Sequence, residues 1–269
     1  MKLIHLTDLH LVPPAGALYG FNPADRLAAV IDTINREHAD SALCVVTGDL
    51  ADEGEPSAYG LLREILQSLR MPWQLLVGNH DHRENFSNAF PEMGRDRNGF
   101  IQSIQDCDAG RLIFLDTLVQ GYGHGALDCG RIEWLSARLA ETPSSGAFLF
   151  AHHPLQPIGM PHFEPAIVRQ WPQVMKMIRN AGAVRHIFCG HVHLDINGNW
   201  SGVPFSACRG VAHHIIPDFV RKDAQFVENT PAFDVALIDA FGVTIHHLKS
   251  SQSPVIARTP EAHFEEEAA

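Results

Sequence analysis

The chain has 269 residues, 45% of them hydrophobic and 19% charged, a composition typical of a globular protein with one large α/β domain or two small ones. Its 20 Lys and Arg against 31 Asp and Glu give a net charge of −11, which argues against a nucleic-acid polymer as partner because such binders carry a basic face. No apolar run approaches the ~20 residues that span a bilayer, and the first residues carry an Asp and two His instead of a secretion signal, so no membrane is expected.

Short apolar runs alternate with helical patterns over the first two thirds of the chain. The runs predict strands at residues 2–6, 42–47, 73–77, 112–116, 147–151 and 186–189. Between the first two runs, Asn22 caps a helix that has Pro23 in its first turn. Further helices are expected over residues 56–69, from about Asp128, and up to Gly182. Strands that alternate with helices imply an α/β fold in which helices cover the faces of a sheet.

After about residue 200 the pattern changes to strands alone, expected at residues 203–208, 233–239 and 243–248. No shift in composition marks a boundary along the chain. We therefore assign residues 1–249 to one domain and residues 250–269 to a polar, acidic tail.

The strand-rich part, residues 200–248, has more β edge than one small sandwich can cover, and exposed edges are usually paired or protected. It also holds a segment too apolar for a free loop, with Ile215, Ile216, Phe219 and Val220. We therefore expect a homo-oligomer with contacts in this part of the chain.

Cysteine and histidine usage points to metal and not to disulfides. The five Cys are odd in number, widely spaced and without a CxxC pair, so we expect buried thiols of a cytoplasmic protein. The 17 His are many for this length, which favours metal binding.

Residues able to bind metal cluster directly after five predicted strands, where open α/β sheets build their sites. Taken singly, most of these motifs can be explained without a metal ion. D-x-H arises by chance, G-D can be an ordinary turn, and H-H before Pro can be two loop histidines that form hydrogen bonds. G-N-H-D is more specific, and so is G-H-x-H, because an i, i+2 pair in an extended segment points two imidazoles the same way. The motif residues are Asp8, His10, Asp49, Asn79, His80, Asp81, His152, His153, His191 and His193.

A pair of metal ions explains all five motifs at once. Imidazole, carboxylate and amide oxygen together suit divalent or trivalent Mn, Fe, Co or Zn, and the sequence leaves the choice among them open. A carboxylate can bridge two ions about 3.5–4 Å apart, the spacing used for in-line attack at phosphorus. Such a centre would attract a phosphodiester anion.

The ordered set D-x-H, G-D, G-N-H-D, H-H and G-H-x-H resembles the calcineurin-like metallophosphoesterase superfamily. The segment LYGF at residues 18–21, the G-H-x-H motif and the C-terminal strands are similar to those of bacterial class III cyclic-nucleotide phosphodiesterases and glycerophosphodiesterases. The resemblance runs over about residues 1–248. It implies a four-layer α/β/β/α metallophosphoesterase sandwich with a C-terminal strand-rich extension, and hydrolysis by a hydroxide bound to two metal ions.

The resemblance also implies the role of each site residue. One metal would be held by Asp8, His10, Asp49 and His193, and the other by Asp49, Asn79, His152 and His191. His80 and the bridging Asp49 would be the catalytic residues. His80 would either stabilise charge or protonate the leaving oxygen. In the alternative without a catalytic role, His80 only separates Asn79 from Asp81 in the chain. The substrate-binding residues would be Asn79, His80, His213, Tyr19 and Phe21. Asp81 would orient a turn, and His153 would support the site through a hydrogen bond.

Protein phosphatases of the superfamily use G-D-x-x-D-R-G, and this chain has Glu53 where their Arg stands. Without that guanidinium a phosphodiester monoanion is the better substrate than a monoester dianion. Loops 11–21 and 155–165 should shape the pocket, where aromatic residues could stack on a base or close a lid. The leading interpretation is hydrolysis of small phosphodiesters, including glycerophosphodiesters. A dedicated 3′,5′-cyclic-nucleotide (cAMP) phosphodiesterase is the alternative, and a catalytically inactive scaffold is the third.

Overall fold

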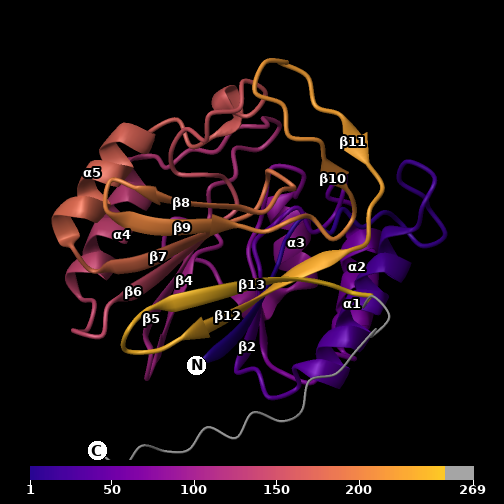
Figure 1. The fold of residues 1–269 in the computed structure, drawn as a ribbon, viewed down its shortest axis with the longest axis horizontal. Coiled ribbons are helices and arrows are strands. Elements are labelled where there is room, and N and C mark those ends of the chain that lie inside the picture. Colours follow the sequence, from indigo (N-terminus) through magenta and orange to yellow (C-terminus); the bar gives the residue numbers. More distant parts are fainter. Residues whose placement is uncertain (252–269) are drawn as a thin grey trace, which may run out of the picture.

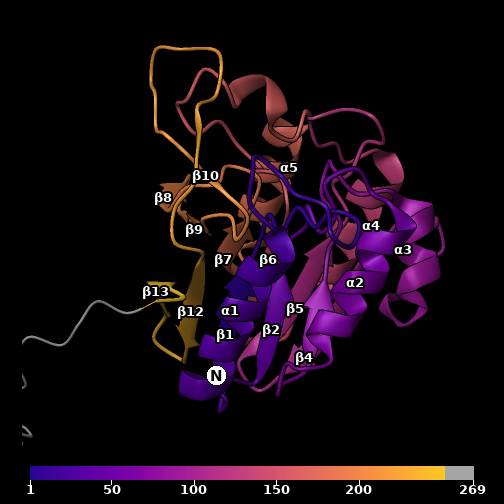
Figure 2. The ribbon, with the colours of Figure 1, turned by 90° about the vertical axis from the view of Figure 1, so that its right-hand side faces the viewer.

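The computed structural model describes residues 1–251, so nearly all of the acidic tail expected at residues 250–269 lies outside the described residues. Two sheets pack face to face and helices cover both outer faces, which confirms the four-layer sandwich (Figures 1 and 2). Within the described part no helix is both long and apolar enough to cross a membrane.

The first sheet has the strand order β13-β12-β1-β2-β3. Its strands are β1 (Lys2–Leu6), β2 (Leu43–Val46), β3 (Trp73–Leu75), β12 (Ala232–Ile238) and β13 (Val243–Lys249). The first three run parallel, while β12 pairs antiparallel with β1. The late strands are therefore part of the sandwich itself and not an extension beside it.

The second sheet has the order β4-β5-β6-β7-β9-β8. Its strands are β4 (Ser103–Cys107), β5 (Gly110–Leu115), β6 (Ala147–Ala151), β7 (Val184–Cys189), β8 (Ile196–Trp200) and β9 (Val203–Ala207). A small hairpin of β10 (His214–Ile215) and β11 (Phe226–Val227) rises above the sandwich (Figure 1).

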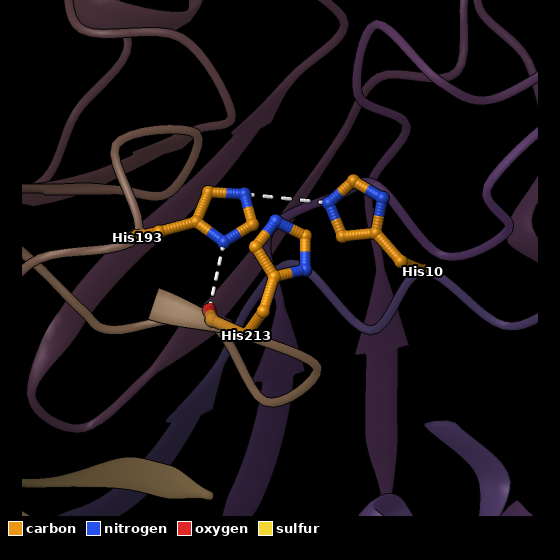
Figure 3. Close-up of side chains that lie close together, drawn as sticks. All are labelled: His10, His193 and His213. Carbon is orange, nitrogen blue, oxygen red and sulfur yellow. Dashed lines mark hydrogen bonds between the residues drawn. The ribbon is translucent and has the colours of Figure 1, made fainter. Parts of the chain in front are cut away.

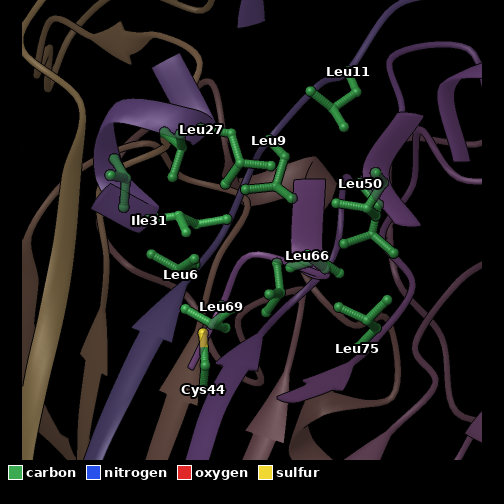
Figure 4. Close-up of a cluster of buried hydrophobic side chains, with 14 of the residues drawn as sticks. Leu6, Leu9, Leu11, Leu27, Ile31, Cys44, Leu50, Leu66, Leu69 and Leu75 are labelled. Atoms are coloured by element: carbon green, nitrogen blue, oxygen red, sulfur yellow. The ribbon is translucent and has the colours of Figure 1, made fainter. Parts of the chain in front are cut away.

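Alternating side chains of the strands divide the core into three layers. Ile4 and Leu6 of β1 pack against α1 (Pro23–Glu37), α2 (Pro56–Leu66) and α3 (Arg83–Ala89), in the cluster of Figure 4. Leu149 of β6 packs against α4 (Cys129–Ala140) and α5 (Trp171–Ala181) on the other outer face. Leu3 of β1 and Phe150 of β6 fill the layer between the sheets.

The predicted helices appear with the expected ends, with one difference. The side chain of Asn22 accepts a hydrogen bond from the Ala24 N–H at 2.9 Å, and Gly182 ends α5 in the left-handed region with φ 63°. The second helix ends at Leu66 and not at residue 69, because the chain closes in turns there. The sequence did not indicate α3, β4 or β8: α3 has only 7 residues, and β4 and β8 are polar strands with exposed positions.

The layer between the sheets contains a buried histidine, His186, whose Nε2 lies 3.0 Å from Ser206 Oγ. Burial lowers the pKa of His186 to about 4, against 6.5 in the unfolded chain. Protons therefore bind the unfolded chain more strongly between these two values, and the free energy of unfolding falls as the pH drops through that window.

We expect His186 to account for about 2 kcal/mol of the stability lost between about pH 7.5 and about pH 5. Urea unfolding of His186→Gln at both pH values should show a pH dependence weaker by that amount. His246→Gln, on an exposed position of β13, is the matched control and should leave the pH dependence unchanged. An unchanged pH dependence in His186→Gln would contradict the assignment.

Candidate metal centre

The motif residues meet at one edge of the sandwich, because the carboxyl ends of β1, β2, β3, β6 and β7 all open there. The chain turns sharply at this edge. Of the eight non-glycine residues with positive φ in the described part, five are Asp8, His10, Asp49, His191 and His193, with φ between 43° and 71°. Each such backbone costs about 1–2 kcal/mol for an L-residue, and strain of this kind collects at functional sites.

Two glycines allow the loops to approach this closely. A Cβ on Gly78 would collide with Asp49 Oδ1, and a Cβ on Gly190 would collide with Thr7 Oγ1. These positions therefore require glycine for space, which explains the glycine that opens the G-N-H-D and G-H-x-H motifs.

A first group of donor atoms surrounds one point. His10 Nε2 lies 3.3 Å from His193 Nε2 (Figure 3). His10 Nε2 also lies 3.6 Å from Asp49 Oδ2, and His193 Nε2 lies 3.4 Å from Asp8 Oδ1. The other ring nitrogen of His193, Nδ1, lies 2.9 Å from the carbonyl oxygen of His213, and this contact orients the ring so that Nε2 faces the donor group. All four side chains are buried.

A second group lies on the other side of the same carboxylate. Asp49 Oδ1 lies 3.3 Å from His152 Nε2, which is 3.0 Å from Asn79 Oδ1. The His191 ring lies 5.1 Å from the His152 ring, centroid to centroid. His152 is held by its Nδ1, 2.8 Å from the carbonyl oxygen of Thr47. The two oxygens of Asp49 thus face two separate groups of donors.

The donor set fits metal ions. Asp8 Oδ1 and His191 Nε2 are buried and have no hydrogen-bond partner among the described residues. Unpaired buried polar atoms are costly in a folded protein and call for a partner. Side chains whose donor atoms lie within 4.8 Å of one another occur at both sides of Asp49: His10, His193 and His213 at one side, and His152, His153 and His191 at the other. A further such group, Asp8, Asp49 and His152, joins the two sides.

Burial and charge set the pKa values of the histidines in opposite directions. Burial and the neighbouring His152 keep the pKa of His191 well below its usual value, so its ring is neutral and offers a lone pair. Burial alone would lower the pKa of His152, yet the Asp49 carboxylate raises it to about 9. A proton therefore occupies His152 at neutral pH in the metal-free protein, and a metal ion would have to displace it.

Asp52 is a functional candidate that the sequence did not indicate. Its Oδ1 lies 3.0 Å from His10 Nδ1, on the opposite side of the ring from Asp49, and so fixes which nitrogen of His10 faces the donor group. Burial lowers the pKa of His10, but the carboxylates, Asp52 first among them, raise it above its usual value. The sequence feature that could have identified Asp52 is its position as the second Asp of G-D-x-x-D.

We expect Asp52→Ala to weaken metal binding about 10–100-fold, the usual effect of losing a carboxylate behind a histidine ligand. Competition with a chelator for Mn²⁺ measures this, and Asp52→Asn should recover part of the affinity. Glu53→Ala changes the exposed neighbour and should have no effect. Equal affinity in wild type and Asp52→Ala would contradict an orienting role.

Asp81 holds the loops together. Its carboxylate accepts hydrogen bonds from the backbone N–H of Leu50, Ala51 and Gly78 and from the Tyr59 hydroxyl, at 2.8–3.2 Å. This residue therefore ties the turn after β2 to the turn after β3. Burial, with the nearby charge of Asp49, raises the pKa of Asp81 to about 6.

His80 stands apart from the buried donors. Its side chain is 42% exposed, its Nδ1 lies 2.7 Å from the carbonyl oxygen of Asp52, and its ring lies 4.6 Å from that of His10. The backbone N–H of His80 donates to Asp49 Oδ1 at 2.9 Å. His80 is thus positioned at the rim, with its ring open to whatever enters from solvent.

A cavity of about 220 Å³ lies over the donor groups, and both predicted loops contribute to its lining, with Tyr19 and His162. The His213 ring stacks on that of His193 at 4.2 Å and closes one side (Figure 3). Phe21, predicted to bind substrate, does not line the cavity: its ring lies under the Arg26 guanidinium at 4.8 Å.

The β10–β11 hairpin supplies two further lining residues that the sequence did not indicate as site residues. Phe226 stacks on Tyr19 at 5.5 Å and meets the His213 ring edge-on at 5.0 Å. Ile215, expected at an interface, is 5% exposed and lines the cavity from the other strand of the hairpin.

Comparison with known proteins gives a consistent result. Residues 1–195 match a family model described as calcineurin-like phosphoesterase. A "probable cyclic nucleotide phosphodiesterase" of Rhodopseudomonas palustris is 40% identical over 225 residues, 82% of either chain. A glycerophosphodiester phosphodiesterase (GpdQ) of Enterobacter lignolyticus is 32% identical over 200 residues, 72% of this chain and 71% of that protein. The structure of a dimetal phosphatase from Danio rerio has the same fold, with a TM-score of 0.69 at 14% identity over 93% of this chain and 99% of that one.

Proposed function

The chain belongs to the calcineurin-like phosphoesterase family, and we propose that it hydrolyses small phosphodiesters, glycerophosphodiesters among them, with the help of two metal ions. The observation that carries this proposal is the position of Asp49, whose two oxygens face two separate groups of donors. That arrangement is what a bridging carboxylate requires.

We assign the ligands accordingly. Asp8, His10, Asp49 and His193 hold one ion, and Asp49, Asn79, His152 and His191 hold the other. Bound metal ions lower the pKa of water and polarise phosphoryl oxygens. We place the ions in the class of Mn, Fe, Co and Zn, because imidazole nitrogen and carboxylate oxygen together suit these metals.

His80 acts on the substrate. Its exposed ring at the rim can donate a hydrogen bond to a phosphoryl oxygen and pass a proton to the leaving oxygen. Asn79 beside it, Tyr19 at the mouth and the neutral His213 complete the substrate contacts. Burial and the neighbouring His193 lower the pKa of His213 to about 2, so this ring binds without adding charge.

The charge of the cavity favours a diester over a monoester. No Lys or Arg is among the described residues that line it. A monoester dianion would have only the metal ions to balance its charge, whereas a diester carries a single negative charge. Glu53, in the position of the phosphatase arginine, is exposed and points to the same preference.

The size of the cavity favours small diesters, since 220 Å³ is below the ~300–1,000 Å³ of pockets for drug-sized ligands. A second candidate, a dedicated cyclic-nucleotide phosphodiesterase, is favoured by the Tyr19–Phe226 aromatic pair at the mouth, which could stack on a base, and by the name of the 40% identical relative.

Turnover of four esters in the presence of Mn²⁺ tests the proposal. We expect hydrolysis of bis(p-nitrophenyl) phosphate and glycerophosphoethanolamine, and little hydrolysis of p-nitrophenyl phosphate. Cyclic AMP as the best substrate would overturn the leading function in favour of the alternative. No turnover of any ester by metal-loaded protein would favour the inactive scaffold.

We also propose that residues 1–249 form one domain, that this domain assembles into a homo-oligomer, and that the protein is cytoplasmic. The five cysteines are free, as is usual in that compartment. The tip of the β10–β11 hairpin exposes Ile216, Phe219 and Val220, the last two 69% and 85% exposed, and such apolar tips favour contact with another chain. Sedimentation should show a species larger than 29.7 kDa that dissociates in Phe219→Asp/Val220→Asp. A wild-type protein that sediments only at 29.7 kDa would contradict the oligomer.

A further inference from the structure

A second polar cluster lies in the apolar layer between the two sheets, below the candidate metal centre. His5 of β1 is the register partner of Asp234 of β12, which is in turn the partner of His247 of β13. Cys208 follows β9 of the opposite sheet and is fully buried. Phe188 packs edge-on against the His5 ring at 5.7 Å, and the other polar pair of this layer is His186 with Ser206.

The cluster holds donor atoms that have no partner in residues 1–251. His5 Nδ1 and Asp234 Oδ2 have no hydrogen-bond partner within ordinary distance and angle limits, and the two residues are 0% and 1% exposed. The Cys208 thiol interacts with the same Asp234 carboxyl group. They face each other at 3.9 Å, which is too long for a hydrogen bond. The donor atoms of His5, Asp234 and Cys208 all lie within 4.8 Å of one another.

A metal ion at His5 Nδ1 requires the tautomer of His5 that has its proton on Nε2. Thr47 Oγ1 lies 2.8 Å from His5 Nε2 and 3.4 Å from the Leu6 carbonyl oxygen, so it can accept from the one and donate to the other. In that tautomer His5 directs the lone pair of Nδ1 at the Asp234 carboxylate. Two electron-rich atoms facing each other in a buried layer require a cation between them or a proton on one of them.

We propose that His5, Cys208 and Asp234 bind a third metal ion, of the Zn²⁺ class, separate from the pair at Asp49. Nitrogen, thiolate sulfur and carboxylate oxygen form a typical zinc donor set. Donors of a tetrahedral zinc site lie about 3.4 Å apart, so the 3.9 Å between His5 Nδ1 and Asp234 Oδ2 would shorten when the ion binds. The thiol proton of Cys208 passes to solvent when the ion binds.

Asp195 lies beside the cluster, and its Oδ1 has no hydrogen-bond partner among the described residues. Asp195 Oδ1 lies 3.5 Å from His247 Nδ1, the same nitrogen that lies 2.7 Å from Asp234 Oδ1. Arg209 pairs with the other oxygen of Asp195 at 2.7 Å. An ion here would join β1 and β12 to the end of β9, and thus fix the two sheets directly below the candidate catalytic edge.

The absorption spectrum of the Co²⁺-loaded protein tests this proposal independently of activity. The proposed ligands of the Asp49 centre include no sulfur, so a thiolate-to-cobalt charge-transfer band in the near ultraviolet reports on a cysteine site alone. All spectra should be recorded in a Cys129→Ser background, because Cys129 is exposed and could bind cobalt adventitiously. We expect the band in this protein and also after Asp49→Ala, which separates the third ion from the proposed function.

Cys208→Ser should abolish the band and reduce bound zinc by one ion per chain. Cys44→Ser is the matched control, because Cys44 is equally buried but packs in the apolar cluster of Figure 4. If Cys208→Ser does not fold, Asp234→Asn should retain the fold and weaken cobalt binding about tenfold or more. Cobalt-loaded protein without the band, or a band that persists in folded Cys208→Ser, would overturn the proposal and leave a protonated hydrogen-bonded cluster.

Discussion

Asp49→Ala is expected to lose both metal ions of the centre and to lower kcat/KM on phosphodiesters about a thousandfold or more. Asp49 faces both donor groups, with Oδ1 3.3 Å from His152 Nε2 and Oδ2 3.6 Å from His10 Nε2. Stabilisation of the transition state by metal ions amounts to several kcal/mol, and about 4 kcal/mol corresponds to a thousandfold in rate.

Metal content and turnover of bis(p-nitrophenyl) phosphate should be measured on the same sample of this variant. Asp32→Ala, on the exposed side of α1, is the control for loss of an aspartate and should match wild type. If Asp49→Ala bound the same number of ions as wild type and turned over normally, the assignment of a bridging carboxylate would be wrong.

His80→Ala is expected to keep its metal ions and to lose about 10²–10⁴-fold in turnover of alkyl diesters such as glycerophosphoethanolamine. The ring of His80 is 42% exposed at the rim and is fixed by the Asp52 carbonyl oxygen, 2.7 Å from Nδ1, so its Nε2 is free to face a substrate. A glycerol alkoxide needs a proton as it leaves, whereas p-nitrophenolate leaves without one. The loss on bis(p-nitrophenyl) phosphate should therefore be much smaller.

The ratio of the two losses distinguishes the roles of His80. Equal losses on both substrates would show that His80 stabilises charge and does not deliver a proton. Loss of a metal ion from the variant would refute its placement on the substrate side. His246→Ala, on an exposed position of β13, controls for removal of a surface histidine.

The sequence predicted the parts of the site that depend on strand ends. A ligand directly after a buried strand lies at the edge of the sheet, so D-x-H, G-D, G-N-H-D, H-H and G-H-x-H could be placed together without coordinates. The helix that Asn22 caps was predictable for a similar reason, because capping and helical spacing are local properties of the chain.

Contacts between distant segments could not be predicted. Asp52 orients His10 across 42 positions of the chain, and nothing in G-D-x-x-D indicates which imidazole it meets. Phe226 reaches Tyr19 only because the β10–β11 hairpin folds over the cavity. Phe21 shows the converse, since its neighbour Tyr19 faces the cavity while Phe21 packs under Arg26. The left-handed backbone at five motif residues is likewise a result of how the loops close.

The most direct test of the metal centre is anomalous scattering from a crystal of the Mn²⁺-loaded protein. Two anomalous peaks about 3.5–4 Å apart are expected, one on each side of the Asp49 carboxylate, with His10 and His193 at one ion and His152 and His191 at the other. A single peak at Asp49, or peaks that these side chains do not touch, would contradict the assignment of a dinuclear centre.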